Sequence, residues 1–229
     1  MATDAFQREK ATRKIEYATS DGKPMAETLW HRIVMMALIQ MLDRWFADRR
    51  EVYVAGNMLV YYVPGNKRKH VSPDVFVVFG VPKKLRGCFL VWEEGKAPTV
   101  VIEVTSKTTK QEGLKTKMAL YQDVLKVKEY FLFDPLGDYL KPRLQGYWLD
   151  KGVLAPIAAL EGRLPSNILG LHLEAESTNL RLYDPGSGTW LPTLEERVER
   201  EHERAEREST GGRTAAAEAT ISKRSRDQK

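Results

Sequence analysis

The chain has a single cysteine, Cys88, and no long hydrophobic run. One cysteine excludes an intrachain disulfide and any cysteine-rich zinc site, and it suits a reducing compartment. The longest helical apolar stretch, Ile33 to Leu42, contains Gln40 and reaches only half of the roughly 20 residues that a membrane span needs. Residues 1–17 carry basic side chains but lack the apolar region of a signal peptide. We therefore expect a cytoplasmic protein with no membrane partner.

Charge of one sign is not in large excess. The 229 residues include 36 basic and 31 acidic side chains, which give a net charge of +5. This balance favours anionic partners only mildly, so the location of the charge matters more than its sum. With 42% apolar and 29% charged residues, the chain is long and apolar enough for one globular domain with appendages.

Two apolar runs each hold an acidic residue that a plain core strand would not accommodate. Asp74 lies in the run 72–79, and Glu103 lies in the run 98–106. An ionised carboxylate costs several kcal/mol to bury without a partner, so two of them on central strands imply a bound cation. A divalent metal fits this requirement. Alternatively, Asp74 is an ordinary strand-entry residue after Pro73, and Glu103 is exposed or salt-bridged.

The order of the segments predicts an α/β fold. A helix is expected over 26–48, and a strand over 52–63 with a bend at Gly56. Residues 89–92 form a short strand or an irregular segment. The Glu103 strand, a helix over 113–125 and a strand over 129–133 together form a βαβ crossover, which is normally parallel. Short strands follow over 144–192.

The composition divides the chain into three parts. Residues 1–19 are predicted to form a polar arm, and residues 20–193 the folded domain. Residues 194–229 are predicted to form a charged tail, with a helix rich in Glu and Arg over 195–208 and a disordered stretch from 209. Because the tail has few apolar residues, we expect it to be dispensable for folding.

Metal-dependent phosphodiester cleavage needs oxygen ligands for Mg²⁺ and a cation near the scissile phosphate. Asp74 and Glu103 can supply carboxylate ligands, and the backbone carbonyl of Val104 is a plausible third. In the commonest sites of this kind the lysine follows two residues after the glutamate, but Thr105 occupies that position here. Lys117 on the following helix could point back over the end of the Glu103 strand, although a helical lysine is usually only solvated.

The chain resembles the PD-(D/E)xK nuclease superfamily, and more closely its Uma2 family, also called DUF820. The resemblance covers roughly Pro24 to Trp190. It depends on four segments in order: HVSPD at 70–74, VIEVTS at 101–106, Lys117 with Tyr121 four residues later, and KEYFLFDP at 128–135. Each segment alone is weak evidence, but their order and spacing together are specific.

The resemblance implies a restriction-endonuclease-like mixed β-sheet flanked by α-helices, with additional strands and the charged tail. It places Asp74, Glu103 and Lys117 at the catalytic positions, and it implies Mg²⁺, or Mn²⁺ in its place, as cofactor. Related nucleases often carry a supporting acidic residue on the first helix, which here is Glu27. Glu27 and His31 share one helical face, and their alternative role is a helix pair without chemistry.

The expected activity is a Mg²⁺-dependent DNA endonuclease. Basic residues near the predicted strands would neutralise the phosphates of bound DNA. These residues are Lys67, Arg68, Lys69, Lys107, Lys110 and Lys115. The cluster at 67–69 is also typical of a solvated hairpin edge. A homodimer is left open as the oligomeric state.

Two alternatives belong to other classes of function. Family members often have Glu-Asp-Leu before the lysine, whereas this chain has Glu112, Gly113 and Leu114. The missing carboxylate favours a catalytically impaired module with the nuclease fold, which binds nucleic acid or has a regulatory role. In the other alternative, the Glu/Arg-rich tail drives protein assembly and the acidic pair is incidental.

Overall fold

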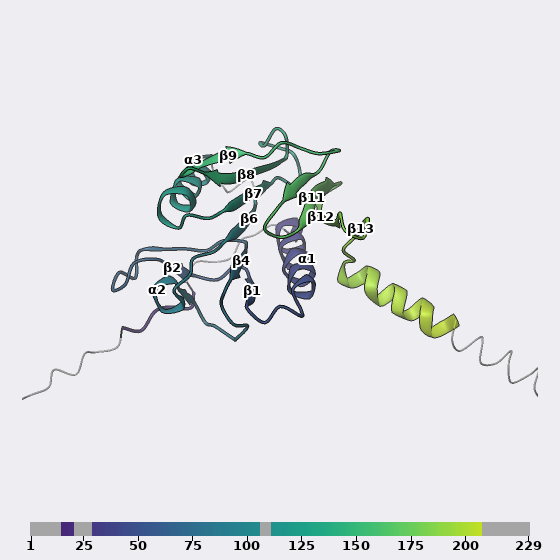
Figure 1. The fold of residues 1–229 in the computed structure, drawn as a ribbon, viewed down its shortest axis with the longest axis horizontal. Coiled ribbons are helices and arrows are strands. Elements are labelled where there is room, and N and C mark those ends of the chain that lie inside the picture. Colours follow the sequence, from purple (N-terminus) through teal and green to yellow (C-terminus); the bar gives the residue numbers. More distant parts are fainter. Residues whose placement is uncertain (1–14, 21–28, 106–110, 208–229) are drawn as a thin grey trace, which may run out of the picture.

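A computed structural model of the chain describes residues 15–20, 29–105 and 111–207. Its centre is a six-stranded mixed sheet in the order β1-β4-β6-β7-β8-β9 (Figure 1). The strands are β1 (Val52–Ala55), β4 (Val75–Phe79), β6 (Val100–Val104), β7 (Glu129–Phe133), β8 (Leu144–Asp150) and β9 (Val153–Pro156). Only β6 and β7 pair in parallel, as expected for the βαβ crossover, and the other neighbours are antiparallel.

Two smaller sheets accompany the central one. The four-stranded sheet consists of β10 (Leu164–Ser166), β11 (Leu171–Glu176), β12 (Asn179–Asp184) and β13 (Thr189–Trp190). The three-stranded sheet has the order β3-β2-β5 and consists of β2 (Val60–Tyr61), β3 (His70–Val71) and β5 (Phe89–Leu90). These strands confirm the mixed sheet with additional β-strands that the sequence predicts.

Within the described residues, three helices precede β7 and one follows β13. They are α1 (Leu29–Trp45), the short α2 (Val91–Glu94), and α3 (Gln111–Ala119), which continues as the π-helix η1 (Leu120–Val124). A further helix over 194–207 extends away from the domain (Figure 1). No described helix is long and apolar enough to cross a membrane.

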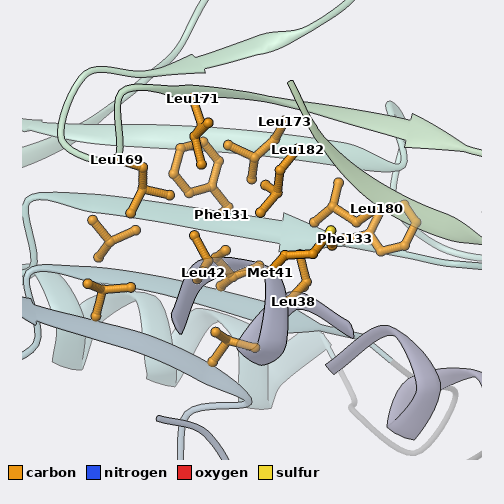
Figure 2. Close-up of a cluster of buried hydrophobic side chains, with 14 of the residues drawn as sticks. Leu38, Met41, Leu42, Phe131, Phe133, Leu169, Leu171, Leu173, Leu180 and Leu182 are labelled. Atoms are coloured by element: carbon orange, nitrogen blue, oxygen red, sulfur yellow. The ribbon is translucent and has the colours of Figure 1, made fainter. Parts of the chain in front are cut away.

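The central sheet is buried on both faces because its strands alternate between two apolar clusters. On one face, α1 and the four-stranded sheet close over Phe131 and Phe133 of β7 (Figure 2). On the other face, Tyr121 of η1 and Leu125 pack against Val101 and Tyr130. Residues of β6 therefore point alternately to α1 and to the α3–η1 side. Glu103 points to the α3–η1 side, where it contacts Tyr121.

Several element boundaries differ from the sequence-based predictions. The single strand expected over 52–63 is two strands in different sheets, because the chain bends at Gly56 and Asn57, where Asn57 has a φ of 48°. A side chain at Gly56 would collide with the Asp74 carbonyl, 2.1 Å from the position of its Cβ. The segment 89–92 forms β5 and then turns into α2. The strands expected over 144–192 divide between the central and the four-stranded sheets.

The predicted arm and tail are only partly described. Tyr17 and Ala18 contact the domain: the Tyr17 hydroxyl accepts a hydrogen bond from the Gly65 amide at 2.8 Å, and the Ala18 carbonyl accepts one from the Tyr61 hydroxyl at 3.1 Å. The charged helix predicted over 195–208 is confirmed over 194–207. The disordered stretch predicted from residue 209 lies outside the described residues, and the three-part division of the chain stays a prediction.

Candidate active site

The two carboxyl groups predicted to hold a metal lie next to each other on adjacent strands. In the antiparallel pair of β4 and β6, Val75 is opposite Ile102, and one further step along the ladder places Asp74 opposite Glu103. Directly opposed residues of this kind have Cβ atoms about 5 Å apart. The backbone also joins them, because the amide of Val104, the residue after Glu103, donates a hydrogen bond to Asp74 Oδ2 at 2.8 Å. The strand register therefore brings together two acids that lie in separate segments of the sequence.

Asp74 is held from two directions. Its Oδ2 accepts a hydrogen bond from the Val104 amide at 2.8 Å and lies 3.1 Å from Nε2 of His31, which is buried on α1. Burial raises the pKa of Asp74, but the His31 hydrogen bond and the positive charges of Lys117 and His31 outweigh it, so the pKa lies below its usual value. The ionised form of the Asp74 carboxyl group is therefore favoured.

Glu103 is buried, with 2% of its surface exposed. Its Oε2 lies 2.8 Å from Nζ of Lys117, and its Oε1 accepts a hydrogen bond of 2.5 Å from the Tyr121 hydroxyl. Burial raises the pKa of Glu103 to about 7, the Asp74 charge acts in the same direction, and Lys117 and Tyr121 oppose both. Two neighbouring carboxyl groups with separated pKa values can share a proton, and a cation between them would replace that proton.

The helix that follows β6 supplies both partners of Glu103. Lys117 and Tyr121 are four residues apart, so they lie on the same side of the helix. The helix changes to π geometry at Leu120, where the amide of Leu125 donates to the Leu120 carbonyl at 3.0 Å. Lys117 also donates to the Ser72 carbonyl at 3.4 Å. The lysine thus bridges the segment before Asp74 and the Glu103 carboxylate.

Thr105 occupies the strand position at which related sites commonly carry lysine. Its side chain is buried and donates a hydrogen bond to the Phe133 carbonyl at 3.2 Å. Thr105 therefore secures the ends of β6 and β7 to each other and supplies no charge. The positive charge comes from Lys117 on the helix that follows β6 instead.

The other predicted site residues have different locations. Lys67, Arg68 and Lys69 are exposed in the turn between β2 and β3, and β3 leads from there to Ser72. Lys115 is exposed on α3. The third predicted ligand is the backbone carbonyl of Val104. Val104 lies at the site, because its amide donates a hydrogen bond to Asp74. Glu27, Lys107 and Lys110 lie outside the described residues.

The donor set fits one hard divalent cation. Mg²⁺ is commonly bound through one or two carboxylates, with water and substrate phosphate oxygens completing its shell. Asp74 and Glu103 provide two such carboxylates, and burial beside each other makes a compensating cation favourable. Within the described part of the chain, no group of three or more His, Cys, Asp or Glu side chains could hold a metal ion. A softer metal that needs several nitrogen or sulfur ligands does not fit this site.

Two site residues were underestimated from the sequence. The sequence places His31 beside Glu27 on one helical face, and in the structure His31 contacts Asp74 directly. The sequence gives Tyr121 as part of the motif with Lys117 but without a role at the site, and in the structure its hydroxyl donates a hydrogen bond to Glu103. The spacing of Tyr121 four residues after Lys117 was an available signal, because a residue that shares a helical face with a site lysine can share its partner. For His31 the corresponding signal is its position four residues after Glu27, the acid expected to support the site from the first helix.

The comparison with protein families agrees with the motifs. The model of the family Uma2, described as "Putative restriction endonuclease", matches residues 3–193. The fold is similar to a crystal structure of a "putative nuclease belonging to DUF820" from Anabaena variabilis ATCC 29413, with a TM-score of 0.49 and 17% sequence identity. That similarity covers 70% of this chain and 87% of the other. No protein of curated function matches the chain.

Proposed function

The chain belongs to the Uma2 family, and from this premise we propose that it is a metal-dependent endonuclease that hydrolyses phosphodiester bonds in DNA. The observation that carries the proposal is the convergence of Asp74, Glu103 and Lys117 in one site. Two acids and one lysine are the minimum set for holding a divalent cation and balancing charge on a phosphate. No other cluster of titratable side chains described above combines these features.

In this proposal, Asp74 and Glu103 hold Mg²⁺ or Mn²⁺, with the Val104 carbonyl as a further ligand. When bound, the cation supplies Lewis-acid activation of a phosphoryl oxygen and of the attacking water. Lys117 contributes the preorganised positive charge for the transition state, because its side chain is 29% exposed and can reach a substrate. His31 and the Val104 amide orient Asp74, and Tyr121 orients Glu103. The exposed basic residues Lys67, Arg68, Lys69 and Lys115 would neutralise flanking phosphates, as would Lys107 and Lys110.

The proposal is tested by cleavage of supercoiled plasmid with Mg²⁺ or Mn²⁺ and with a chelator. We expect metal-dependent nicking by the natural chain and its loss in Asp74→Asn prepared in the same way. The asparagine keeps the shape of the side chain, so circular dichroism should show an unchanged fold. Cleavage that survives in both the chelator and Asp74→Asn would refute the proposal.

A second candidate function is a nuclease-fold module that binds nucleic acid without cleaving it. Gly113 favours it, because this position lacks the carboxylate that family members often carry, and no third acid joins Asp74 and Glu103 within the described residues. Binding of DNA and of Mn²⁺ without any product in the plasmid assay would select this candidate over the first.

A further inference from the structure

The turn between β2 and β3 presents three positive charges on a short support. Residues 63–69, which we call the basic turn, are all exposed, and they include Lys67, Arg68 and Lys69. The strands β2 and β3 pair over only two residues each, so the hairpin alone gives the turn little rigidity. From the turn, β3 leads to Ser72, whose carbonyl accepts a hydrogen bond from Lys117 at 3.4 Å. The position of the basic turn therefore sets where its charges lie relative to the candidate active site.

The segment 15–20 contacts this hairpin at two points. The Tyr17 hydroxyl accepts a hydrogen bond from the Gly65 amide of the basic turn at 2.8 Å. One residue later, the Ala18 carbonyl accepts a hydrogen bond from the Tyr61 hydroxyl of β2 at 3.1 Å. The segment thus ties the basic turn to the strand from which the turn leaves.

Tyr17 is itself held by aromatic neighbours. The centroid of its ring lies 4.9 Å from that of Tyr61 and 5.3 Å from that of Trp92 on α2. Separations of this size are favourable for aromatic pairs. Tyr61 is buried in the domain. The Tyr17 ring is therefore attached to the domain, and its hydroxyl gives the basic turn a fixed acceptor.

The hydrogen bond to Gly65 contributes more to order than to stability. Gly65 is exposed, so its amide could donate to water instead, and exchanging one partner for the other changes the stability of the fold little. The bond does restrict the conformations of the basic turn. Ordering a binding loop before its ligand arrives removes part of the entropic cost of binding. The benefit of the bond therefore falls on a ligand of the turn.

We propose that Tyr17 is a positioning residue for DNA binding, which holds the basic turn so that its three cationic side chains meet backbone phosphates beside the candidate active site. The inference rests on the proposed function for the identity of the ligand. Each basic side chain that contacts a phosphate raises the affinity through counterion release, whatever the base sequence. That gain depends on where the charges lie, and Tyr17 sets their position from 48 residues earlier in the chain.

The test measures binding of the full chain to a short fluorescein-labelled DNA duplex by anisotropy, in a chelator that prevents cleavage. Tyr17→Phe keeps the ring contacts and loses the hydrogen bond, and it should raise Kd roughly fivefold, the effect of one neutral hydrogen bond. Tyr17→Ala also loses the ring contacts and should raise Kd further. The matched control is Tyr147→Phe, which loses a hydrogen bond of the same 2.8 Å length to Gln145 on β8 and should leave Kd unchanged.

A second set of variants separates positioning from a general effect on the fold. In a chain with Lys67→Gln, Arg68→Gln and Lys69→Gln, binding should weaken and depend less steeply on salt, and Tyr17→Phe should then have no further effect on Kd. In the plasmid assay, Tyr17→Phe should raise KM and leave kcat unchanged.

Three results would overturn the proposal: an unchanged Kd in Tyr17→Phe, an equal loss in the chain whose basic turn is neutralised, or no DNA binding by the natural chain. The proposed cleavage activity can fail separately. A chain that binds DNA with this dependence on Tyr17 and yields no product with Mg²⁺ or Mn²⁺ would support the positioning role and refute the nuclease activity alone.

Discussion

Lys117 Nζ lies 2.8 Å from Glu103 Oε2, and the two side chains differ in their access to solvent. The Glu103 side chain is 3% exposed, whereas that of Lys117 is 29% exposed. The acid is therefore fixed in the interior, while the lysine can reach a molecule at the surface without leaving its partner. This asymmetry suits a group that must act on a substrate, and it makes Lys117 the most direct residue to test.

Lys117→Ala should reduce Mg²⁺-dependent plasmid cleavage by roughly 10²-fold or more, the scale of losing one preorganised electrostatic contact with a transition state. Metal binding should persist because Asp74 and Glu103 are unchanged. The matched control is Lys115→Ala, about 200° away on the same helix, which should change cleavage only a few-fold. Equal losses in both variants would mean that general basicity, rather than one placed lysine, is what the helix contributes.

The melting temperature of Glu103→Gln, relative to that of the natural chain at the same pH, should be higher at pH 8 than at pH 5. The pKa of Glu103 is about 7 in the fold and 4.5 in its ordinary state, so the folded chain holds a proton that the unfolded chain releases between these values. The stability of the natural chain is therefore lost as the pH rises through this window. Glutamine has no such dependence.

The expected difference between the two pH values is on the order of 1–3 kcal/mol, or several degrees. It is measured by thermal unfolding in the presence of a chelator, so that adventitious cations do not occupy the site. If the two chains differ by the same amount at pH 5 and pH 8, Glu103 does not titrate in this range.

His31→Ala should weaken Mn²⁺ binding by about tenfold at pH 6, the scale of one hydrogen bond to a charged group. Without the His31 hydrogen bond and charge, the pKa of Asp74 rises, and protons compete with the metal for its carboxylate. The loss should therefore be smaller at pH 8. His31→Gln, which can place an amide donor near the position of Nε2, should recover part of the affinity. Titration calorimetry measures the Mn²⁺ affinity of the natural chain and of both variants. A uniform loss at every pH, without recovery in glutamine, would indicate a packing defect.

A chain that ends at Thr193 should keep its fold. The segment removed contains few apolar residues, and its described contacts with the domain centre on Glu196 and Arg181. We expect the melting temperature to fall by no more than ~5 °C, which corresponds to about 1–2 kcal/mol for a chain of this size. The measurement is made at low protein concentration, where association contributes least. A drop of many degrees would show that the tail completes the core.

The sequence predicted the parts of the site that depend on strong local patterns. Asp74 and Glu103 were visible because acids are anomalous in apolar strands, and the β6–β7 crossover followed from strand and helix periodicity. The contact of His31 with Asp74 was not predictable, because it joins two residues 43 positions apart through the packing of α1. The division of 52–63 into two strands was missed for a similar reason: alternation identifies strands but does not assign them to sheets.

The π-helical turn at Leu120–Val124 has a consequence for insertions and deletions in this chain. A π turn accommodates one residue more than an α turn, so deleting a single residue here would still permit a continuous helix. The part that carries Lys117 would, however, rotate by ~100° relative to Leu125 and the strand that follows. A length change that helix propensity would tolerate would thus turn the lysine away from Glu103, and we expect the residue count between Lys117 and Glu129 to be invariant among chains that use this arrangement.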